Sequence, residues 1–541
     1  MQVFPQAVVT QRRRIVNITG SMLIGGSEVR GTEGVLRAWN PTAGTDMEPD
    51  FAAGGLVEVN RACLLAQEAF DSYRETPLEI RAQFLRSIGQ GILNLGDSLV
   101  DRACAETGLP RGRIEGERGR TVGQLDLFAS VVCEGRWIDA TLDSPLPDRK
   151  PLPRPDLRLR KVALGPVAVF GASNFPLAFS VAGGDTASAF AAGCPVVVKA
   201  HPSHLGTSEF VARVIQRAVA DCGLHEGVFS LLVGQGNAIG RDLVQHPAIK
   251  AVGFTGSRLG GLSLMRIAAE RPEPIPVYAE MSSINPILLF PSALAKNAET
   301  LAKGFVDSLT LGVGQFCTNP GIVFAIESEG FQHFRRAAAQ ELSTRSAGTM
   351  LSPQIHSAYQ RGLERLDSAP DVHTLARIDA PPEGCVGAPA LFSTTAKHLL
   401  AQPECADEVF GPSSILVGCE TVEQMRRVLE QLPGQLTASL LLDEQDLDMA
   451  RTLLPLLERK VGRIVFNGFP TGVEVSHAMV HGGPFPATSD SRTTSVGASA
   501  IERFLRPVSY QNMPQALMPA SLQDANSLKL WRVRDGKLEQ R

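Results

Sequence analysis

The sequence predicts an α/β protein built on doubly wound parallel sheets, and three observations lead to that prediction. With 541 residues, the chain is too long for one ordinary hydrophobic core, so we expect two or three domains. From residue 162, short apolar runs alternate with helical patterns at 176–192 and 204–222, as in a buried parallel sheet. A second series, with a helical pattern at 292–312 and the runs GIVFAI and SILVG, predicts another α/β domain.

The segments outside these two series have their own patterns. Apolar residues near helical spacing over 58–73 and 79–107 predict helices, and the second stops at a glycine and a proline. Residues 141–156 hold five prolines, which favours an extended connector or an edge hairpin. The last 20 residues are polar, so we expect a loosely held end.

Composition excludes several classes of protein. Hydrophobic residues make up 44% and charged residues 20%, as in soluble globular proteins, and the net charge of −4 offers no broad basic surface for nucleic acid. No apolar run reaches the roughly 20 residues of a membrane span, and the first residues do not resemble a secretory signal. Nine scattered cysteines lack metal-binding or disulfide spacing. We therefore expect a cytoplasmic protein that needs no metal and has no nucleic-acid or membrane partner.

Five short motifs suggest the chemistry. They are GASNFPLAF (171–179), FTGS (254–257), YAEMSSINP (278–286), GQFCTNPG (314–321) and DEVFGP (407–412). In this order and spacing they resemble the aldehyde dehydrogenase superfamily, over about residues 35–505. The spelling of SNFPLAFS, GQFCTNPG and HGGPFPATSDSRTTSVG is similar to the branch that contains 2-oxoglutarate semialdehyde (2,5-dioxovalerate) dehydrogenases and an NADP-dependent aldehyde dehydrogenase.

The resemblance implies an aldehyde dehydrogenase-like fold in three parts. Residues 1–136 and 159–288 correspond to a Rossmann-type cofactor-binding domain, and 289–482 to a second α/β domain, the catalytic one. Residues 137–158 and 483–541 correspond to a small β oligomerisation element and a C-terminal tail. An edge strand completed by a second subunit makes a homodimer natural, with a homotetramer as the second expectation.

Three residues match the catalytic positions of the family. Cys317 matches the nucleophile that attacks the aldehyde carbon, although most cysteines in proteins are merely buried. Asn174 matches the asparagine that faces the oxyanion, and it could equally cap a helix. Glu280 matches the general base that activates water, with a solvated strand-end carboxylate as the alternative. Relatives that pass the acyl group to coenzyme A generally lack this carboxylate, so Glu280 favours hydrolysis to a free acid.

The cofactor positions are also carried over from the resemblance, because no GxGxxG fingerprint is present. Family members that prefer NAD often carry a glutamate three residues after the matching lysine, and this chain has Pro202 there. We therefore expect NADP to be accepted and preferred, with NAD also usable. Each position could alternatively be ordinary turn chemistry, and His201 an uninvolved loop residue. The expected cofactor-binding residues are Lys199, His201, Gly236, Gly240, Thr255, Gly256, Ser257, Met281, Glu408 and Phe410.

The expected substrate is 2-oxoglutarate semialdehyde (2,5-dioxopentanoate), oxidised to 2-oxoglutarate. This expectation rests only on the resemblance of the sequence to that branch of the family. The alternative is a fatty or other aliphatic aldehyde. Phe316 and Thr318 flank the matched nucleophile, and the aromatic residues suited to the wall of an entry tunnel are Phe175, Phe179 and Phe469. A distal carboxylate needs cationic or hydroxyl groups. The candidates for that role are Arg160, Arg463, Ser476 and Ser491.

Overall fold

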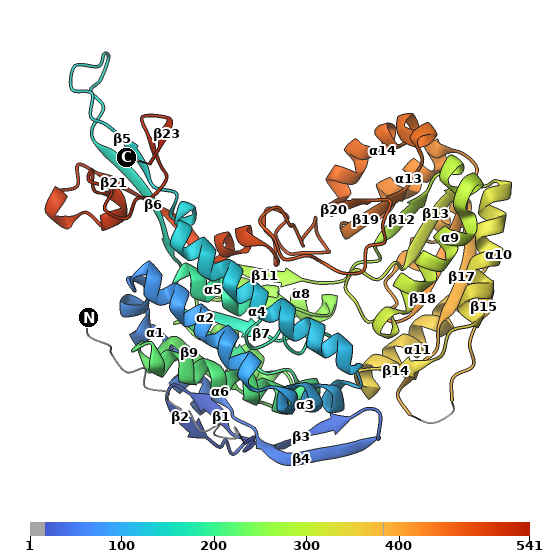
Figure 1. Cartoon of the computed structure of the whole chain (residues 1–541), viewed down its shortest axis with the longest axis horizontal. Helices are drawn as coiled ribbons and strands as arrows, with labels where there is room; N and C mark the ends of the chain where they lie inside the picture. The colour runs from blue at the N-terminus through green and yellow to red at the C-terminus, as the bar shows by residue number, and fades with distance from the viewer. Residues whose placement is uncertain (1–16, 382–383, 541) are drawn as a thin grey trace, which may run out of the picture.

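A computed structural model describes residues 17–381 and 384–540 (Figure 1). Two seven-stranded sheets lie side by side, each covered by helices, and a smaller sheet forms an arm that projects from one end. The prediction of an α/β fold with two parallel sheets is confirmed. The site described below lies where the two large sheets meet.

The first sheet has the strand order β11-β10-β7-β8-β9-β1-β2, and the five strands from β11 to β9 run parallel. All five are short runs of buried apolar residues, as expected for strands covered on both faces. Their bounds are Val167–Phe170 (β7), Val196–Lys199 (β8), Phe229–Leu232 (β9), Ala251–Thr255 (β10) and Val277–Glu280 (β11), and β1 (Met22–Ile24) and β2 (Ser27–Val29) complete the edge.

Helices connect and cover this sheet. The connecting helices are α5 (Gly184–Ala192), α6 (Leu205–Asp221), α7 (Ala238–Gln245) and α8 (Arg258–Ala269). The N-terminal helices are α1 (Leu56–Arg74), α2 (Leu78–Asn94), α3 (Asp97–Thr107) and α4 (Arg111–Glu134), preceded by the hairpin β3 (Val35–Asn40) and β4 (Thr45–Ala52). Helix α2 packs against α4 and α6, and α4 packs against α5, so the N-terminal helices form an outer layer over one face.

One predicted helix forms only in part. The pattern at 176–192 predicts a single helix, whereas α5 begins at Gly184 and residues 176–182 form turns. A distant carboxylate holds this turn: Glu117 on α4 accepts the backbone N–H groups of Leu177 and Ala178 at 2.8 and 2.9 Å. The turn that follows Asn174 is therefore fixed by α4, and Asn174 does not cap a helix.

The second sheet has the strand order β15-β17-β18-β13-β12-β19-β20, all parallel except the edge strand β15. Side chains alternate between two hydrophobic clusters: Ile287 packs on one face and Leu288 on the other, as the two-residue strand period requires. The strands are β12 (Pro286–Leu289), β13 (Ile322–Ile326), β15 (His373–Arg377), β17 (Ala390–Thr395), β18 (Ser413–Cys419), β19 (Gln435–Leu441) and β20 (Val461–Phe466).

Helices also cover both faces of the second sheet. One face is covered by α9 (Pro291–Thr310) and α10 (Glu329–Ser343). The other is covered by α11 (Pro353–Ser368), α12 (Ala396–Ala401), α13 (Val422–Gln431) and α14 (Leu447–Lys460). A small ladder of β14 (Gly348–Thr349) and β16 (Val386–Gly387) lies beside them.

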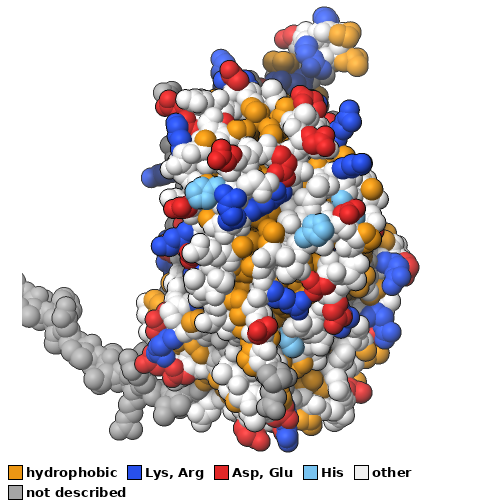
Figure 2. All heavy atoms as spheres, turned by 90° about the vertical axis from the view of Figure 1, so that its right-hand side faces the viewer, with side chains coloured by type: hydrophobic (Ala, Val, Ile, Leu, Met, Phe, Trp, Pro, Cys, Tyr) orange, Lys and Arg blue, Asp and Glu red, His pale blue; other side chains and the backbone are white. Residues whose placement is uncertain are grey.

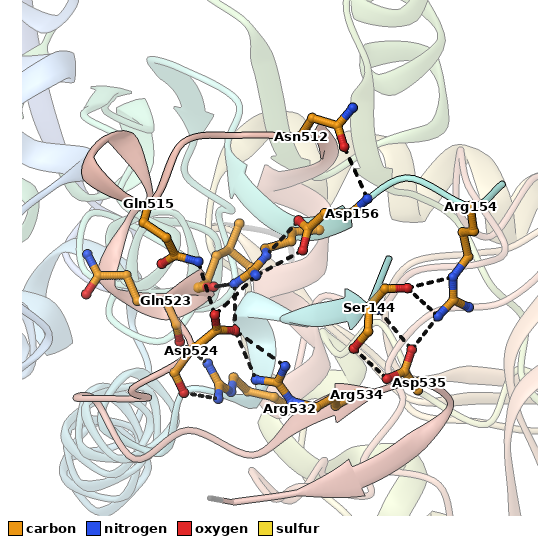
Figure 3. Close-up of polar contacts among 12 residues, drawn as sticks. Ser144, Arg154, Asp156, Asn512, Gln515, Gln523, Asp524, Arg532, Arg534 and Asp535 are labelled. Atoms are coloured by element: carbon orange, nitrogen blue, oxygen red, sulfur yellow. Dashed lines mark hydrogen bonds and ion pairs between the residues drawn. The ribbon is translucent and has the colours of Figure 1, made fainter. Parts of the chain in front are cut away.

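The arm is a five-stranded sheet with the order β21-β6-β5-β22-β23. It joins β5 (Thr141–Asp143) and β6 (Leu157–Ala163) to β21 (Leu505–Gln511), β22 (Arg532–Arg534) and β23 (Lys537–Glu539). Figure 3 shows the polar contacts that hold it: Asp535 accepts from Ser144 Oγ at 2.7 Å and pairs with Arg154 at 2.6 Å. The expectation of a loosely held end is therefore wrong, because the polar tail residues pair with the arm strands.

Charged side chains of both signs lie on one face of the molecule (Figure 2). Figure 2 shows acidic and basic side chains interspersed over the face of the molecule that belongs to the second sheet, with no patch of one sign. Within residues 17–381 and 384–540, no helix combines the length and the apolar character needed to cross a membrane.

Candidate active site

The site lies between opposite edges of the two large sheets. In the first sheet, β10 and β11 end at Thr255 and Glu280, at the carboxyl edge where ligands bind in open α/β sheets. In the second sheet, the loop that carries Cys317 precedes β13 and therefore lies at the amino edge. The chain crosses directly from β11 to β12 through residues 281–285, which brings the two edges together.

The cysteine loop is pinned by its backbone. The side-chain amide of Asn285 donates to the carbonyl oxygens of Cys317 and Asn319 at 2.8 and 2.9 Å. Gly314 has φ +63°, and a Cβ atom there would lie 2.4 Å from the backbone of Gly411, so only glycine fits. The polar and glycine residues of GQFCTNPG therefore form a fixed loop with a half-buried thiol at its centre.

A histidine joins the predicted nucleophile to the predicted base. Nε2 of His481 lies 3.3 Å from Sγ of Cys317 and 2.9 Å from Oε1 of Glu280. The other carboxylate oxygen of Glu280 accepts from the hydroxyl of Ser495 at 2.5 Å. The side chains of His481 and Glu280 are 1% and 2% exposed, so the contact is shielded from water.

A late segment of the chain supplies both new residues. Residues 484–489 run along β11, where Met281 N–H donates to Ala487 O at 2.8 Å and Ser489 N–H donates to Ala279 O at 3.0 Å. Ser495 N–H then donates to His481 O at 2.9 Å, which closes the segment on itself. His481 and Ser495 stand in the string HGGPFPATSDSRTTSVG, but sequence reasoning gave neither a role, because a fold-back onto β11 has no local signature.

Electrostatics leave the thiol protonated before substrate binds. Burial raises the pKa of the Cys317 thiol well above its ordinary value, the Glu280 carboxylate raises it further, and Arg120 lowers it. Burial also raises the pKa of Glu280, but the adjacent His481 side chain and the hydroxyl of Ser495 outweigh it. The pKa of Glu280 is therefore lowered overall. Glu280 is ionised, so it can stabilise a proton that passes from the thiol to His481.

The same three side chains form a compact donor set. One ligand atom each from Glu280, Cys317 and His481 lies within 4.8 Å of the others, and within the described part of the chain no other group of three meets this criterion. Thiolate and imidazole favour soft or borderline cations such as Zn²⁺.

Asn174 lies beside the cysteine loop, as predicted for an oxyanion contact. Its Nδ2 donates to Gln315 O at 3.1 Å, two residues before Cys317. An amide has two N–H donors, so one remains available. The backbone N–H of Cys317 has no hydrogen-bond acceptor among the described residues.

Lys199 and His201 differ in their ability to hold a phosphate. Burial lowers the pKa of the Lys199 ammonium to about 8, and within the described ranges no carboxylate forms an ion pair with it. Nδ1 of His201 accepts from Ser203 N–H at 3.1 Å. Burial, together with His204 and Lys199, lowers the pKa of His201 well below its ordinary value. The imidazole is neutral at neutral pH, so Lys199 is the cation of this pair.

The other predicted cofactor residues of the first sheet lie near its carboxyl edge. Gly236, with φ +63°, precedes α7, and a Cβ atom at Gly240 would lie 3.1 Å from the Phe170 ring. Ser257 caps α8 by accepting from Gly260 N–H at 3.2 Å. Gly256 N–H donates to Glu280 O at 3.1 Å, and Met281 is buried against the first core. Thr255 is the last residue of β10.

Glu408 and Phe410 lie on the opposite side, in the loop before β18. They line a small enclosed space with Ser283, Phe316 and Asn319. Burial raises the pKa of the Glu408 carboxyl to about 7, an effect that the neighbouring serine hydroxyl partly offsets. No hydrogen bond or ion pair joins the described residues Glu408 and Lys199, which lie at different sheets, so the predicted cofactor residues form two groups.

A cavity of about 340 Å³ opens on Cys317. Two of the three predicted tunnel residues, Phe175 and Phe179, line it, together with Phe316 and Thr318. Phe469 does not, because it packs on Gly304 of α9. The predicted carboxylate-binding groups Arg160, Arg463, Ser476 and Ser491 are not among its lining residues either. The cations in the lining are instead Arg113 and Arg120 of α4, which sequence reasoning missed.

Comparison with known proteins decides the family. The model of the "Aldehyde dehydrogenase family" matches residues 29–496. This chain belongs to the aldehyde dehydrogenase family. It is an NAD(P)-dependent oxidoreductase, and the resemblance stated from the motifs is confirmed.

Two curated relatives cover nearly the whole chain. An alpha-ketoglutaric semialdehyde dehydrogenase 2 of Azospirillum brasilense is 58% identical over 525 residues, which cover 97% of this chain and 100% of that protein. An alpha-ketoglutaric semialdehyde dehydrogenase of Acinetobacter baylyi is 47% identical, and the match covers 96% of this chain and 99% of that protein.

Solved structures confirm the fold. Betaine aldehyde dehydrogenase from Staphylococcus aureus, in complex with NAD+, superposes with a TM-score of 0.79 at 19% identity, covering 92% of this chain and 96% of that one. A 1-pyrroline-5-carboxylate dehydrogenase gives a TM-score of 0.76 at 22% identity, covering 91% of this chain and 92% of that one.

Proposed function

We propose that this aldehyde dehydrogenase oxidises alpha-ketoglutaric semialdehyde (2-oxoglutarate semialdehyde) to 2-oxoglutarate. The near full-length identity to two dehydrogenases named for that aldehyde supports the substrate. The observation that carries the chemistry is the buried contact of Cys317, His481 and Glu280 at the end of an open cavity.

Cys317 is the proposed nucleophile. The thiol proton passes to Nε2 of His481, whose positive charge is then stabilised by Glu280 at 2.9 Å. The thiolate attacks the aldehyde carbon, and a thiohemiacetal forms. The nicotinamide, when bound, supplies the acceptor for a hydride, and a thioester on Cys317 remains.

Asn174 and the Cys317 backbone are the proposed oxyanion donors. The free amide proton of Asn174 and the Cys317 N–H can both donate to the oxygen of the former aldehyde. Fixed donors cost no reorganisation during the reaction, and one of them contributes on the order of 10²–10³ in rate. The pinning of the loop by Asn285 supports this role, because it holds the Cys317 N–H in place.

Glu280 is the proposed general base for hydrolysis. Its carboxylate is ionised, and Ser495 holds one oxygen at 2.5 Å, which leaves Oε1 on the side of His481 and Cys317. A water placed between Glu280 and the thioester would lose a proton to the carboxylate and attack the acyl carbon. The thiolate then leaves, and the acid is released.

The residues at the first sheet edge suit a dinucleotide. The Lys199 ammonium, buried without an ion pair in the described ranges, suits a phosphate or ribose hydroxyl. Pro202 replaces the acid that would repel a 2′-phosphate, so we propose NADP as the preferred acceptor and NAD as a second one. Gly236, Gly240, Thr255, Gly256, Ser257, Met281, Glu408 and Phe410 are proposed to hold the rest of the cofactor, with His201 as a neutral neighbour.

The arm is proposed to join subunits. Its sheet ends in the edge strands β21 and β23, and edge strands tend to pair with another chain. We propose a homodimer through the arm, with a pair of dimers as the second possibility. The cofactor-binding part is then 1–136 with 159–288, the catalytic part 289–482, and the oligomerisation part 137–158 with 483–541.

Initial rates with two aldehydes test the proposed substrate. Reduced cofactor is measured with alpha-ketoglutaric semialdehyde and with decanal, each with NADP and NAD. A kcat/KM at least 100-fold higher for the semialdehyde is expected. Three phenylalanines line the cavity and favour the second candidate, an aliphatic aldehyde dehydrogenase. A preference for decanal would establish that candidate instead.

A further inference from the structure

Two arginines of one helix face the cavity that opens on Cys317. Arg113 and Arg120 lie seven residues apart on α4, so they share one face of the helix, two turns apart. Both line the cavity, together with Phe175, Phe179 and Cys317. The two arginines differ in the charged and polar groups that surround them.

Arg113 is already neutralised. Its Nη1 lies 2.7 Å from Oε2 of Glu117, one helical turn further along α4. The other oxygen of Glu117 accepts the backbone N–H groups of Leu177 and Ala178. Arg113 is thus part of the support for the turn that follows Asn174.

Arg120 has no such counterpart. Its Nε and Nη2 are buried and have no hydrogen-bond acceptor, and no ion pair joins it to any residue that the structure describes. Its guanidinium carbon lies 5.0 Å from the centre of the Phe179 ring and 5.8 Å from that of Phe175. Burial lowers the pKa of this guanidinium. Aromatic faces attract a cation but accept few of its N–H groups, so a buried guanidinium here lacks its usual acceptors.

We propose that Arg120 binds the distal carboxylate of the aldehyde substrate, an inference that rests on the function proposed above. A planar guanidinium matches a carboxylate with two parallel hydrogen bonds, and binding there would supply the acceptors that Arg120 lacks. The two aromatic rings beside it would cover the methylene carbons of the substrate. An alkyl chain in the same place would leave the buried cation unpaired.

The position of Arg120 relative to Cys317 suits a short substrate. The Phe179 ring contacts Arg120 and also lies 6.2 Å from the His481 ring, whose Nε2 touches the nucleophile. Arg120 and Cys317 also line the same cavity, and the charge of Arg120 acts on the Cys317 thiol, so the cation and the nucleophile share one substrate space.

A role only in activating Cys317 explains the geometry less well. Arg120 lowers the pKa of the Cys317 thiol, yet that pKa stays well above its ordinary value. The side chain that contacts the sulfur is His481, and Glu280 in turn contacts His481; Arg120 contacts neither in the described residues. The unpaired nitrogens of Arg120 thus remain without a function until an anion enters the cavity.

The test compares three aldehydes in the full-length enzyme with NADP. Alpha-ketoglutaric semialdehyde and glutaric semialdehyde carry the carboxylate, and pentanal has the same chain length without it. In Arg120→Gln, the kcat/KM ratio of each semialdehyde to pentanal should fall roughly 100-fold, mainly through KM, as expected for a lost charged contact. Arg120→Lys should recover part of the ratio. The matched control is Arg118→Gln on the same helix, where Arg118 donates to Gly96 O and is absent from the cavity lining.

The outcomes separate the inference from the function it rests on. A wild-type enzyme that prefers pentanal would overturn the proposed function, and the inference with it. A wild-type preference for the semialdehydes with an unchanged ratio in Arg120→Gln would overturn the inference alone. An equal loss with all three aldehydes would also overturn it, because that pattern indicates an effect on Cys317 or on folding.

A second measurement needs no variant and covers the case in which Arg120→Gln does not fold. Glutarate should inhibit pentanal oxidation by the wild-type enzyme competitively, while pentanamide at the same concentration should inhibit much less. Equal inhibition by the two compounds would overturn the inference.

Discussion

Two cysteine–histidine–carboxylate groups occur among residues 17–381 and 384–540, and of these two, one has the surroundings of an active site. Cys317, His481 and Glu280 lie at the end of a cavity, with distances of 3.3 and 2.9 Å and a carboxylate side chain only 2% exposed. Cys405 lies 3.8 Å from His398, which lies 3.7 Å from Asp371, and that carboxylate side chain is 78% exposed.

The difference lies in burial of the carboxylate and in exposure of the cysteine, since Cys405 is buried and Cys317 half-buried. Burial raises the pKa of both thiols, so thiol acidity alone does not distinguish them. Water screens Asp371, whereas Glu280 interacts with His481 in a shielded contact. The substitutions of Cys317, Glu280 and His481 below therefore each have a counterpart in the second group as a control.

The largest effect is expected from Cys317→Ala. Without the nucleophile no thiohemiacetal forms, so kcat should fall at least about 10⁴-fold, while NADP binding by fluorescence titration stays within about threefold. The control Cys405→Ala should keep kcat within about twofold. Comparable losses in the two variants would break the distinction between the groups.

The second largest effect is expected from Glu280→Gln. An amide cannot take a proton from water, so hydrolysis of the thioester should slow by about 10²–10⁴-fold. Stopped-flow absorbance should show one equivalent of reduced cofactor per site, followed by a slow phase. An unchanged steady-state rate would remove Glu280 from the mechanism, and Asp371→Asn is expected to show no such change.

His481→Gln should lower kcat/KM by about 10–100-fold at pH 7. The Cys317 thiol has a raised pKa and loses its proton acceptor in this variant, so activity should depend more on hydroxide and recover as pH rises to 9. The pH profile of kcat/KM checks this, with His398→Gln as the control. An equal loss at pH 7 and pH 9 would contradict a role in proton transfer.

The smallest effect concerns the cofactor. Lys199→Met should lower the preference for NADP over NAD by roughly tenfold, the value of about 1.4 kcal/mol for one charged contact. Because the pKa of Lys199 is about 8, the wild-type ammonium is charged below that pH and loses its charge above it. The wild-type KM for NADP should therefore rise above pH 8, while that for NAD changes less. Parallel changes for both cofactors would contradict the role of Lys199.

The parallel strands of both large sheets can be predicted from the sequence, because buried parallel strands are continuous apolar runs. It also singles out Cys317 from Cys405, since GQFCTNPG belongs to an ordered set of motifs and the surroundings of Cys405 do not. It fails where distant residues decide local structure. Glu117 accepts N–H groups 60 and 61 positions away, in the turn that stands where the sequence predicts the start of the helix at 176–192.

Part of the site could not be predicted for the same reason. His481 reaches Cys317 from 164 positions away, and this contact depends on a segment that folds back along β11. Arg120 lies in α4, and the sequence of this helix does not indicate that Arg113 forms an ion pair whereas Arg120 forms none in the described structure. Pairing depends on tertiary contacts, which one sequence does not contain.

Intact-protein and peptide mass spectrometry of Glu280→Gln tests the account most directly. The variant is mixed with alpha-ketoglutaric semialdehyde and NADP and then quenched in acid. The account predicts a mass increase of one 2-oxoglutaryl group on the peptide that contains Cys317, and no increase in Glu280→Gln/Cys317→Ala. An unmodified Cys317 in a Glu280→Gln enzyme that keeps turning over the semialdehyde would contradict it.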